Sequence, residues 1–266
     1  MTPLHKRNIK RIAAAHDLTY FNQNDHAQPV RKMLLWKSTM ILPKHILGNF
    51  DEALASIRNN VLMMAGLTER SLDRAVKGLL QRDDDLCANA IADDEEIDQL
   101  EKQIDKDGVD ILLRFQPVAS DLRRVVSAMK MSSNLERMAD QATTIARRAR
   151  KLNQHPPLPE VQLIRPMYDH AMTMFKGSVE AFVREDASLA RSVVPQDQKL
   201  DDLNRTTSRR LIDRMAEDPD QLRGYLNLIF VSRCLERVGD HATNIAEEAV
   251  YAVAAEDIRH QPVAAS

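Results

Sequence analysis

Two short acidic motifs recur one hundred residues apart, and their residue types and spacing are suited to binding a cation. Residues 135–140 (LERMAD) contain Glu136 and Asp140, and residues 235–240 (LERVGD) contain Glu236 and Asp240. Over the longer windows 135–149 and 235–249, nine of fifteen residues are identical. Each motif places two acids four residues apart on one helix face, where like charges repel and destabilise an isolated helix. The recurrence of this unfavourable pair predicts a positive group, such as a metal cation, beside it.

A second pair of acids is also duplicated. Residues 94–100 (DEEIDQL) and 197–203 (DQKLDDL) share the pattern D-x-x-[IL]-D-x-L, which supplies Asp94 and Asp98, then Asp197 and Asp201. If each of these helices packs antiparallel on the helix that carries the first motif, four carboxylates converge in each repeat. Four oxygen ligands suit a hard or borderline cation such as Mg²⁺, Mn²⁺ or iron, with room for more than one metal.

The alternative is that these acids only solvate the surface. Charged residues make up 29% of the chain, so acidic pairs on helix faces are common. By helix geometry Glu236 and Asp240 lie almost opposite the apolar face of their helix, which makes them surface groups, and the two Asp of each D-x-x-[IL]-D-x-L segment lie on the flank of the apolar stripe. Duplication of both pairs favours a site, although a tandem duplication copies surfaces as well as functions. His241 follows Asp240, but a single histidine beside a helix acid is more often a surface residue than a ligand.

Long helices must position these acids. Apolar residues recur at helical spacing, and Gly, Pro and acidic residues mark the helix ends. The fold class predicted is all-α, with two tandem three-helix bundles of up-down-up, spectrin-like form. The helices expected span residues 50–81, 83–115 and 120–152 in the first bundle, and residues 161–184, 187–215 and 218 onwards in the second.

The domain organisation follows from this pattern. The first repeat covers residues 44–153, a Pro-rich linker covers 154–160, the second repeat covers 161–254, and 255–266 form a C-terminal tail. Residues 1–43 show no sustained period and form an N-terminal extension that is either disordered or the product of a misassigned start. Residues 1–45 carry a net charge of +6, so the rest of the chain carries −8, which disfavours nucleic-acid binding.

The cysteines and the hydropathy of the chain indicate where in the cell the protein acts. The two cysteines, Cys87 and Cys234, lack the spacing of a zinc site or a disulfide framework, which indicates cytosolic residence. No apolar run is long enough to span a bilayer, so contact with a membrane goes only through partners.

Several segments together resemble the PhoU family of bacterial phosphate-signalling accessory proteins. They are residues 117–123 (PVASDLR), 135–140 (LERMAD) and 235–247 (LERVGDHATNIAE), with an opening Phe50-Asp51-Glu52 helix. The resemblance covers residues 44–254 and implies two three-helix bundles in a homodimeric, PhoU-like cytoplasmic protein.

The resemblance also implies a metal site. Some family members carry multinuclear iron or zinc clusters on paired [ED]-x-x-x-D motifs. The matching residues here are Asp94, Asp98, Glu136 and Asp140 in the first repeat and Asp197, Asp201, Glu236 and Asp240 in the second. Iron is the first expectation, with zinc, manganese or magnesium as alternatives. In the second repeat, Asn244 and Glu248 continue the row of polar residues at i+4 spacing that begins with Glu236 and Asp240, which we call the second stripe. The first repeat has Thr144 and Arg148 at these positions, so we expect the second site to bind metal more tightly.

The function implied by the resemblance is non-enzymatic. A PhoU-like protein represses the phosphate-starvation response and modulates phosphate uptake. Its partners are the ATPase subunit of the phosphate ABC transporter and a phosphate-responsive sensor histidine kinase, which place it at the inner face of the membrane.

Three other functions are compatible to different degrees with an acidic helical bundle. A metal-binding helical scaffold or storage protein would use the same acids without a signalling role, and a purely structural adaptor would use them only for solvation. A di-iron oxidase of the ferritin-like kind needs an inward-facing E-x-x-H motif on each of two helices. No E-x-x-H occurs in the 266 residues.

Overall fold

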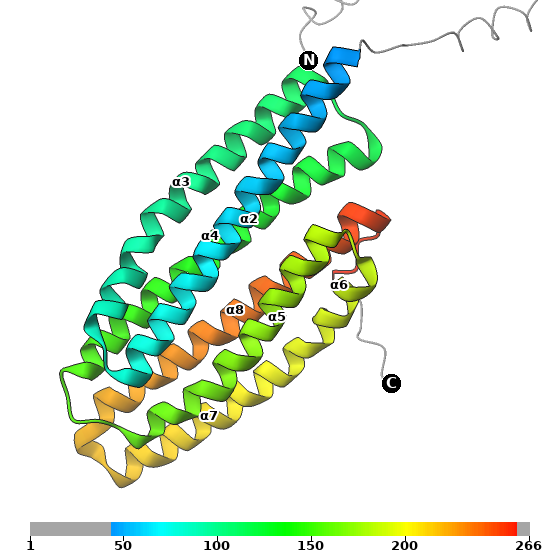
Figure 1. Ribbon diagram of the computed structural model, residues 1–266. Coiled ribbons are helices and arrows are strands. Elements are labelled where there is room, and N and C mark those ends of the chain that lie inside the picture. The colour runs from blue at the N-terminus through cyan, green and yellow to red at the C-terminus, as the bar shows by residue number, and fades with distance from the viewer. Residues whose placement is uncertain (1–43, 260–266) are drawn as a thin grey trace, which may run out of the picture. The chain divides into compact units, whose positions relative to one another are not determined.

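The computed structural model describes residues 44–259, with side chains from residue 48 (Figure 1). The predicted extension 1–43 and the last residues of the tail lie outside this range. Within it the chain is helical and contains no strand, which confirms the predicted all-α class. The α-helices are α2 (Lys44–Gln81), α3 (Asp84–Phe115), α4 (Ala119–Asn153), α5 (Ile164–Arg184), α6 (Ala187–Val193), α7 (Asp197–Glu217) and α8 (Leu222–Ala254).

The helices of the first repeat follow the sequence prediction closely. Asp83 caps α3, accepting a hydrogen bond from the Leu86 backbone N at 2.9 Å. This bond satisfies one of the free N–H groups of the first helical turn. α3 and α4 then pack antiparallel, because Asn153 at the end of α4 donates to Asp84 at the start of α3, at 2.8 Å.

The second repeat departs from the prediction. The continuous helix expected over residues 187–215 is broken into α6 and α7 by the 3-10 helix η4 (Val194–Gln196). Pro195 lies in η4, and a proline inside an α-helix removes one backbone hydrogen bond and clashes with the preceding turn. As a result Asp197 stands in the first turn of a new helix, α7.

The last helix also begins later than expected. The sequence predicted a helix start at Asp218-Pro219, but Pro219–Gln221 form the 3-10 helix η5 and α8 begins at Leu222. Between α4 and α5, Pro159–Leu163 form the 3-10 helix η3, which lies partly inside the residues predicted as linker.

The two repeats pack against each other through α4 and α8, which run antiparallel and side by side (Figure 1). Near one end Lys130 pairs with Glu248 at 2.9 Å, and near the other Arg148 donates to Asn227 at 3.1 Å. α2 and α5 are also antiparallel neighbours, joined by the Lys176–Glu69 ion pair at 2.9 Å. Within the described part of the chain, residues 45–259 belong to one compact unit.

The apolar faces predicted for the third helix of each repeat form the core between the helices. Leu135, Met138 and Ile145 of α4 and Leu235, Val238 and Ile245 of α8 are all fully buried. Within residues 44–259, no helix combines the length and the apolar character that crossing a membrane requires.

Candidate functional site

The first acidic cluster consists of Asp94 and Asp98 on α3 with Glu136 and Asp140 on α4. The structure brings all four together, because the two helices are antiparallel neighbours. Partial burial raises the pKa of Asp94, and the charges of Asp140 and Asp98 raise it further. Four predicted residues therefore share one electrostatic environment.

Glu136 lies at the centre of this cluster. Its pKa rises to about 7, first because the carboxyl group is partly desolvated and then because Asp140, Glu101 and Asp98 repel its charge. Glu101 was not predicted from the sequence, although it follows Asp94 and Asp98 at helical spacing (i, i+4, i+7). The pKa of Glu101 is raised as well, by burial and by Asp105 and Asp98.

The second acidic cluster consists of Asp197 and Asp201 on α7 with Glu236 and Asp240 on α8. Desolvation and the charges of Asp197, Glu236 and Asp201 together raise the pKa of Asp240 to about 6. The pKa of Asp197 is also raised, by burial and then by Asp201 and Glu236. Desolvation and repulsion between carboxylates thus raise pKa values in both repeats, at Glu136 and Asp94 in the first and at Asp240 and Asp197 in the second.

Asp197 has a local environment that the sequence did not reveal. Its Oδ1 atom is buried and has no hydrogen-bond partner among the described atoms. His170 of α5 partly offsets the raised pKa of Asp197, and a ring nitrogen of His170, Nε2, lies 2.9 Å from the Gln196 carbonyl oxygen. An orphaned carboxylate oxygen at the start of a helix can accept a cation or a donor group.

Gly239 lets α7 and α8 approach closely beside this oxygen. A Cβ atom at position 239 would lie 2.3 Å from the Leu200 Cδ2 atom and 3.5 Å from Asp197 Oδ1. The first repeat has Ala139 at the corresponding position. A side chain larger than that of glycine at position 239 would therefore require Leu200 to move.

The predicted acids lie at the surface, as expected. Asp140 and Asp240 are exposed, and the other six acids are half-buried. Their carboxylate oxygens fit the ligand preference of hard and borderline cations. In the part of the chain described, however, no three His, Cys, Asp or Glu side chains are arranged so that they could hold a metal ion.

The prediction that Asn244 and Glu248 extend the second stripe is wrong. Glu248 is 8% exposed and pairs with Lys130 of α4, while Asn244 donates to Asn134 at 3.3 Å. Four residues of an α-helix advance by about 400°, so each i+4 step turns about 40° away from the starting face. After three steps from Glu236 the side chain faces α4 instead of the cluster.

The same rotation along the helix explains why Arg148 does not act on the first cluster as expected. Its guanidinium lies 3.8 Å from the centroid of the Phe230 ring on α8, in a cation–π contact. The arginines whose charges act on the first cluster are instead Arg147, which lowers the pKa of Asp94, and Arg137, which lowers the pKa of Glu136. The counterpart of Arg147 in the second repeat is Glu247.

His241 belongs to the contact between the repeats. Its Nδ1 atom lies 3.1 Å from Asn134 Oδ1 on α4. Burial, together with Arg137 and Arg237, lowers the pKa of His241 to about 4. The ring is thus neutral near pH 7 and is held away from the acidic cluster by its partner on α4.

The fold and the paired clusters define a class of proteins, namely all-α proteins formed by tandem duplication of one three-helix unit with carboxylates on its second and third helices. The family model described as the PhoU domain matches residues 61–149 and 164–249. The chain belongs to the PhoU family, which confirms the resemblance seen in the sequence.

Relatives of known designation support this membership over most of the chain. A phosphate-specific transport system accessory protein PhoU homolog from Pseudomonas putida is 40% identical over 82% of this chain and 86% of its own length. The accessory protein PhoU of Escherichia coli is 35% identical over 82% of this chain and 91% of its own.

Solved structures agree with the fold. The crystal structure of PhoU from Pseudomonas aeruginosa superposes with a TM-score of 0.76 at 38% identity, over 78% of this chain and 100% of that one. The phosphate transport system regulatory protein PhoU from Streptococcus pneumoniae gives a TM-score of 0.72 at 26% identity, over 78% and 98% of the two chains.

Proposed function

We propose that the protein is a non-enzymatic regulator of the phosphate system that represses the phosphate-starvation response when phosphate is plentiful. The observation that carries this proposal is its similarity, over most of the chain, to phosphate-specific transport system accessory proteins. In this role it acts in the cytoplasm, as a homodimer, and reaches the inner face of the membrane through partners.

The partners proposed are the ATPase subunit of the phosphate ABC transporter and a phosphate-responsive sensor histidine kinase. The protein offers long helices with charged outer faces, a kind of surface that suits reversible contacts of modest area. The net charge of −8 after residue 45 favours basic surfaces on these partners.

Deletion of the gene tests the regulatory role. Alkaline phosphatase activity is measured in phosphate-rich medium for the deletion strain, with and without the gene restored on a plasmid. We expect high activity without the gene and repression with it. Repression that persists in the deletion strain, with no second copy of the gene present, would refute the proposal.

We further propose that both acidic clusters bind metal, iron first, with zinc, manganese or magnesium as alternatives. The residues are Asp94, Asp98, Glu136 and Asp140, and Asp197, Asp201, Glu236 and Asp240. The raised pKa values support this, because mutual repulsion among carboxylates is relieved by a bound cation. The carboxylates need to reorient around the ion, since their present positions do not enclose one.

Metal content after loading with Fe²⁺, Zn²⁺ or Mn²⁺ tests the clusters separately from phosphate signalling. Glu236→Gln with Asp240→Asn should remove the metal of the second cluster, whereas Glu180→Gln, an exposed acid of α5, should not. The same variants in the phosphatase assay distinguish a metal-dependent regulator from a metal-binding scaffold or storage protein. A scaffold would bind metal while the deletion strain stays repressed.

A further inference from the structure

One side of α8 exposes large apolar side chains and arginines together. Leu222, Leu226 and Phe230 follow each other at i+4 spacing and are 44%, 41% and 46% exposed. Arg233 and Arg237, both exposed, continue the row along the helix. With about 100° of turn per residue, all five fall within an arc of about 80°. They therefore form one continuous surface, which we call the arginine face.

Arg148 of α4 joins the arginine face from the neighbouring helix. Its guanidinium lies 3.8 Å from the centroid of the Phe230 ring. Burial raises the pKa of the Cys234 thiol on α8, and the charges that lower it are those of Arg148, Arg237 and Arg233. Three guanidinium groups from two helices therefore lie around one part of the surface.

The two helical segments that build this face contain no acid. Residues 222–235 of α8 include two arginines, and residues 141–153 of α4 include three arginines and one lysine. The acids that border the face are Asp220, which precedes α8, and Glu236 and Asp240, which belong to the second cluster. The arginine face is thus a local region of positive charge on a chain that is acidic after residue 45.

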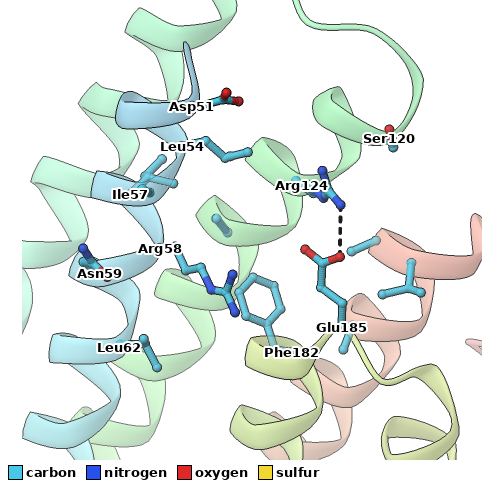
Figure 2. A pocket seen from close by; sticks show the side chains of 15 residues that line it. Asp51, Leu54, Ile57, Arg58, Asn59, Leu62, Ser120, Arg124, Phe182 and Glu185 are labelled. Atoms are coloured by element: carbon cyan, nitrogen blue, oxygen red, sulfur yellow. Dashed lines mark hydrogen bonds and ion pairs between the residues drawn. The ribbon is translucent and has the colours of Figure 1, made fainter. Parts of the chain in front are cut away.

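The positive charge of this face is not compensated within the chain. Within residues 48–259, its three arginines form no ion pair. The arginines at the cavity lined by α2, α4 and α5 behave differently. There Arg124 pairs with Glu185 at 3.0 Å, and Arg58 donates to the Val183 carbonyl oxygen (Figure 2). Only the arginine face is therefore left to attract an external anion.

The first repeat does not reproduce this surface. Phe230 and Arg233 correspond to Lys130 and Ser133 of α4. Lys130 is paired with Glu248 and is not available to an external partner. The three-helix fold can therefore be built without this combination of exposed apolar and basic residues, so the fold itself does not explain it.

We propose that the arginine face binds the surface of an anionic phospholipid bilayer. Leucine and phenylalanine side chains on one side of a helix enter the boundary between headgroups and acyl chains. Arginines on the same side reach the lipid phosphates and are attracted by the negative surface potential. The face extends about 22 Å along α8 from Leu222 to Arg237, so several lipids contact it at once.

The apolar residues distinguish a bilayer from other anionic ligands. A dissolved phosphate or a nucleic-acid backbone would use the arginines but would gain nothing from Leu222, Leu226 and Phe230. A bilayer uses both kinds of side chain. This contact is additional to the partners proposed above and does not depend on a role in phosphate regulation.

Sedimentation with vesicles measures the binding of the full chain. One set of vesicles contains phosphatidylglycerol and phosphatidylcholine in equal amounts, and the other contains phosphatidylcholine alone. We expect saturable binding to the anionic vesicles and binding on the order of tenfold weaker, or less, to the neutral ones. Absence of binding, or equal binding to both sets, would overturn the proposal.

Removal of two charges tests the position of the contact. Arg233→Gln with Arg237→Gln should weaken binding on the order of tenfold or more. Lys102→Gln with Lys106→Gln on α3 removes two exposed charges at the same spacing and should leave binding almost unchanged. Residues 1–45 carry a charge of +6 and also attract anionic vesicles. If they alone held the protein, both double variants would bind like the unmodified chain, and the proposal would fail.

Removal of the apolar side chains tests for a bilayer. Leu226→Ser with Phe230→Ser should weaken vesicle binding on the order of tenfold, because these side chains no longer enter the lipid. The matched control is Val109→Ser with Leu113→Ser, an exposed apolar pair at the same spacing on α3. Equal effects of the two pairs would overturn the proposal, as would an Arg233→Gln, Arg237→Gln loss without any loss from the serine pair at 226 and 230.

Quenching by brominated lipid tests insertion without changing any charge. The chain has one tryptophan, Trp36, so Leu226→Trp in a Trp36→Phe background carries a single reporter on the face. Brominated phosphatidylcholine in the anionic vesicles should quench this reporter and should not quench Leu113→Trp in the same background. Equal quenching of both would contradict the assignment. If polyglutamate binds through Arg233 and Arg237 while vesicles do not, an acidic protein is the occupant and the proposal fails.

Discussion

Lys130 of α4 and Glu248 of α8 form an ion pair at 2.9 Å between the two repeats. The Glu248 side chain is 11% exposed, and its Oε2 atom is buried with no hydrogen-bond partner among the described residues. Lys130 Nζ also lies 5.7 Å from the centroid of the Tyr251 ring. The lysine therefore offsets a buried negative charge in the contact between the repeats, together with Arg259, whose charge also interacts with Glu248.

Replacement of this lysine should destabilise the protein. Lys130→Met leaves the Glu248 carboxylate buried and unpaired, which costs about 1–3 kcal/mol of the free energy of unfolding. Adding Glu248→Gln should recover most of the loss. Urea denaturation at pH 7.5 measures both variants. As a control, Arg184→Met breaks the exposed pair with Glu180 and should cost much less. Equal losses for both lysine and arginine variants would contradict this account.

Arg147 should determine the difference in metal affinity between the two clusters. Its positive charge acts on Asp94 in the first cluster, whereas the second repeat has Glu247 at this position. We expect the second cluster to bind Mn²⁺ more tightly, and Arg147→Glu to strengthen the first on the order of tenfold. The first cluster is measured alone in a Glu236→Gln, Asp240→Asn background by competition with a fluorescent chelator.

The control for this prediction is Arg114→Glu near the far end of α3, which changes the net charge equally. It is highly exposed and about 30 Å along the helix from Asp94. If both arginine variants alter the affinity to the same extent, net charge and not the position of Arg147 explains the effect.

Much of the fold could be predicted from the sequence, because the signals that define the helices are local in the chain. Apolar periodicity and caps such as Asp83 predicted the helices of the first repeat. The break before Asp197 was missed because residues 187–215 keep a helical pattern through Pro195. The packing of Leu158 could not be predicted from the sequence either, because it depends on contacts with Gly224, sixty-six residues away in the chain.

The candidate site was found through duplication, and duplication also set the limits of that prediction. The eight acids occur at corresponding positions, but Glu101 corresponds to Asn204 and His170 to Leu67, so comparison of the repeats could not find them. Glu248 was wrongly expected beside the second cluster, because three successive i+4 steps rotate the side chain away from the face that carries Glu236.

Both cysteines should resist alkylation in the folded protein. Burial is the main cause that raises the pKa of Cys87 and of Cys234, each to about 11, and only the thiolate is reactive. We expect little reaction with iodoacetamide at pH 8 and complete reaction of both thiols in urea, followed by mass spectrometry. Ser192→Cys on the exposed face of α6 provides a reactive control in the same fold. Native thiols that react as fast as this control would show that the helices around them open readily.

Stability of the metal-free protein should depend on pH through Glu136. Its folded-state pKa of about 7 lies above its ordinary value of 4.5, so between these pH values the folded protein holds a proton that the unfolded chain has released. The Glu136 carboxyl group therefore favours folding less as pH rises from 4.5 through 7.

Glu136→Gln removes the charge, and with solvent screening it should stabilise the protein by about 1–2 kcal/mol more at pH 8 than at pH 5. Urea denaturation in EDTA at both pH values measures the difference, and Glu180→Gln should show a change below about 0.5 kcal/mol. A Glu136→Gln effect that does not vary with pH would mean that the carboxylates of the first cluster do not repel one another in the folded protein.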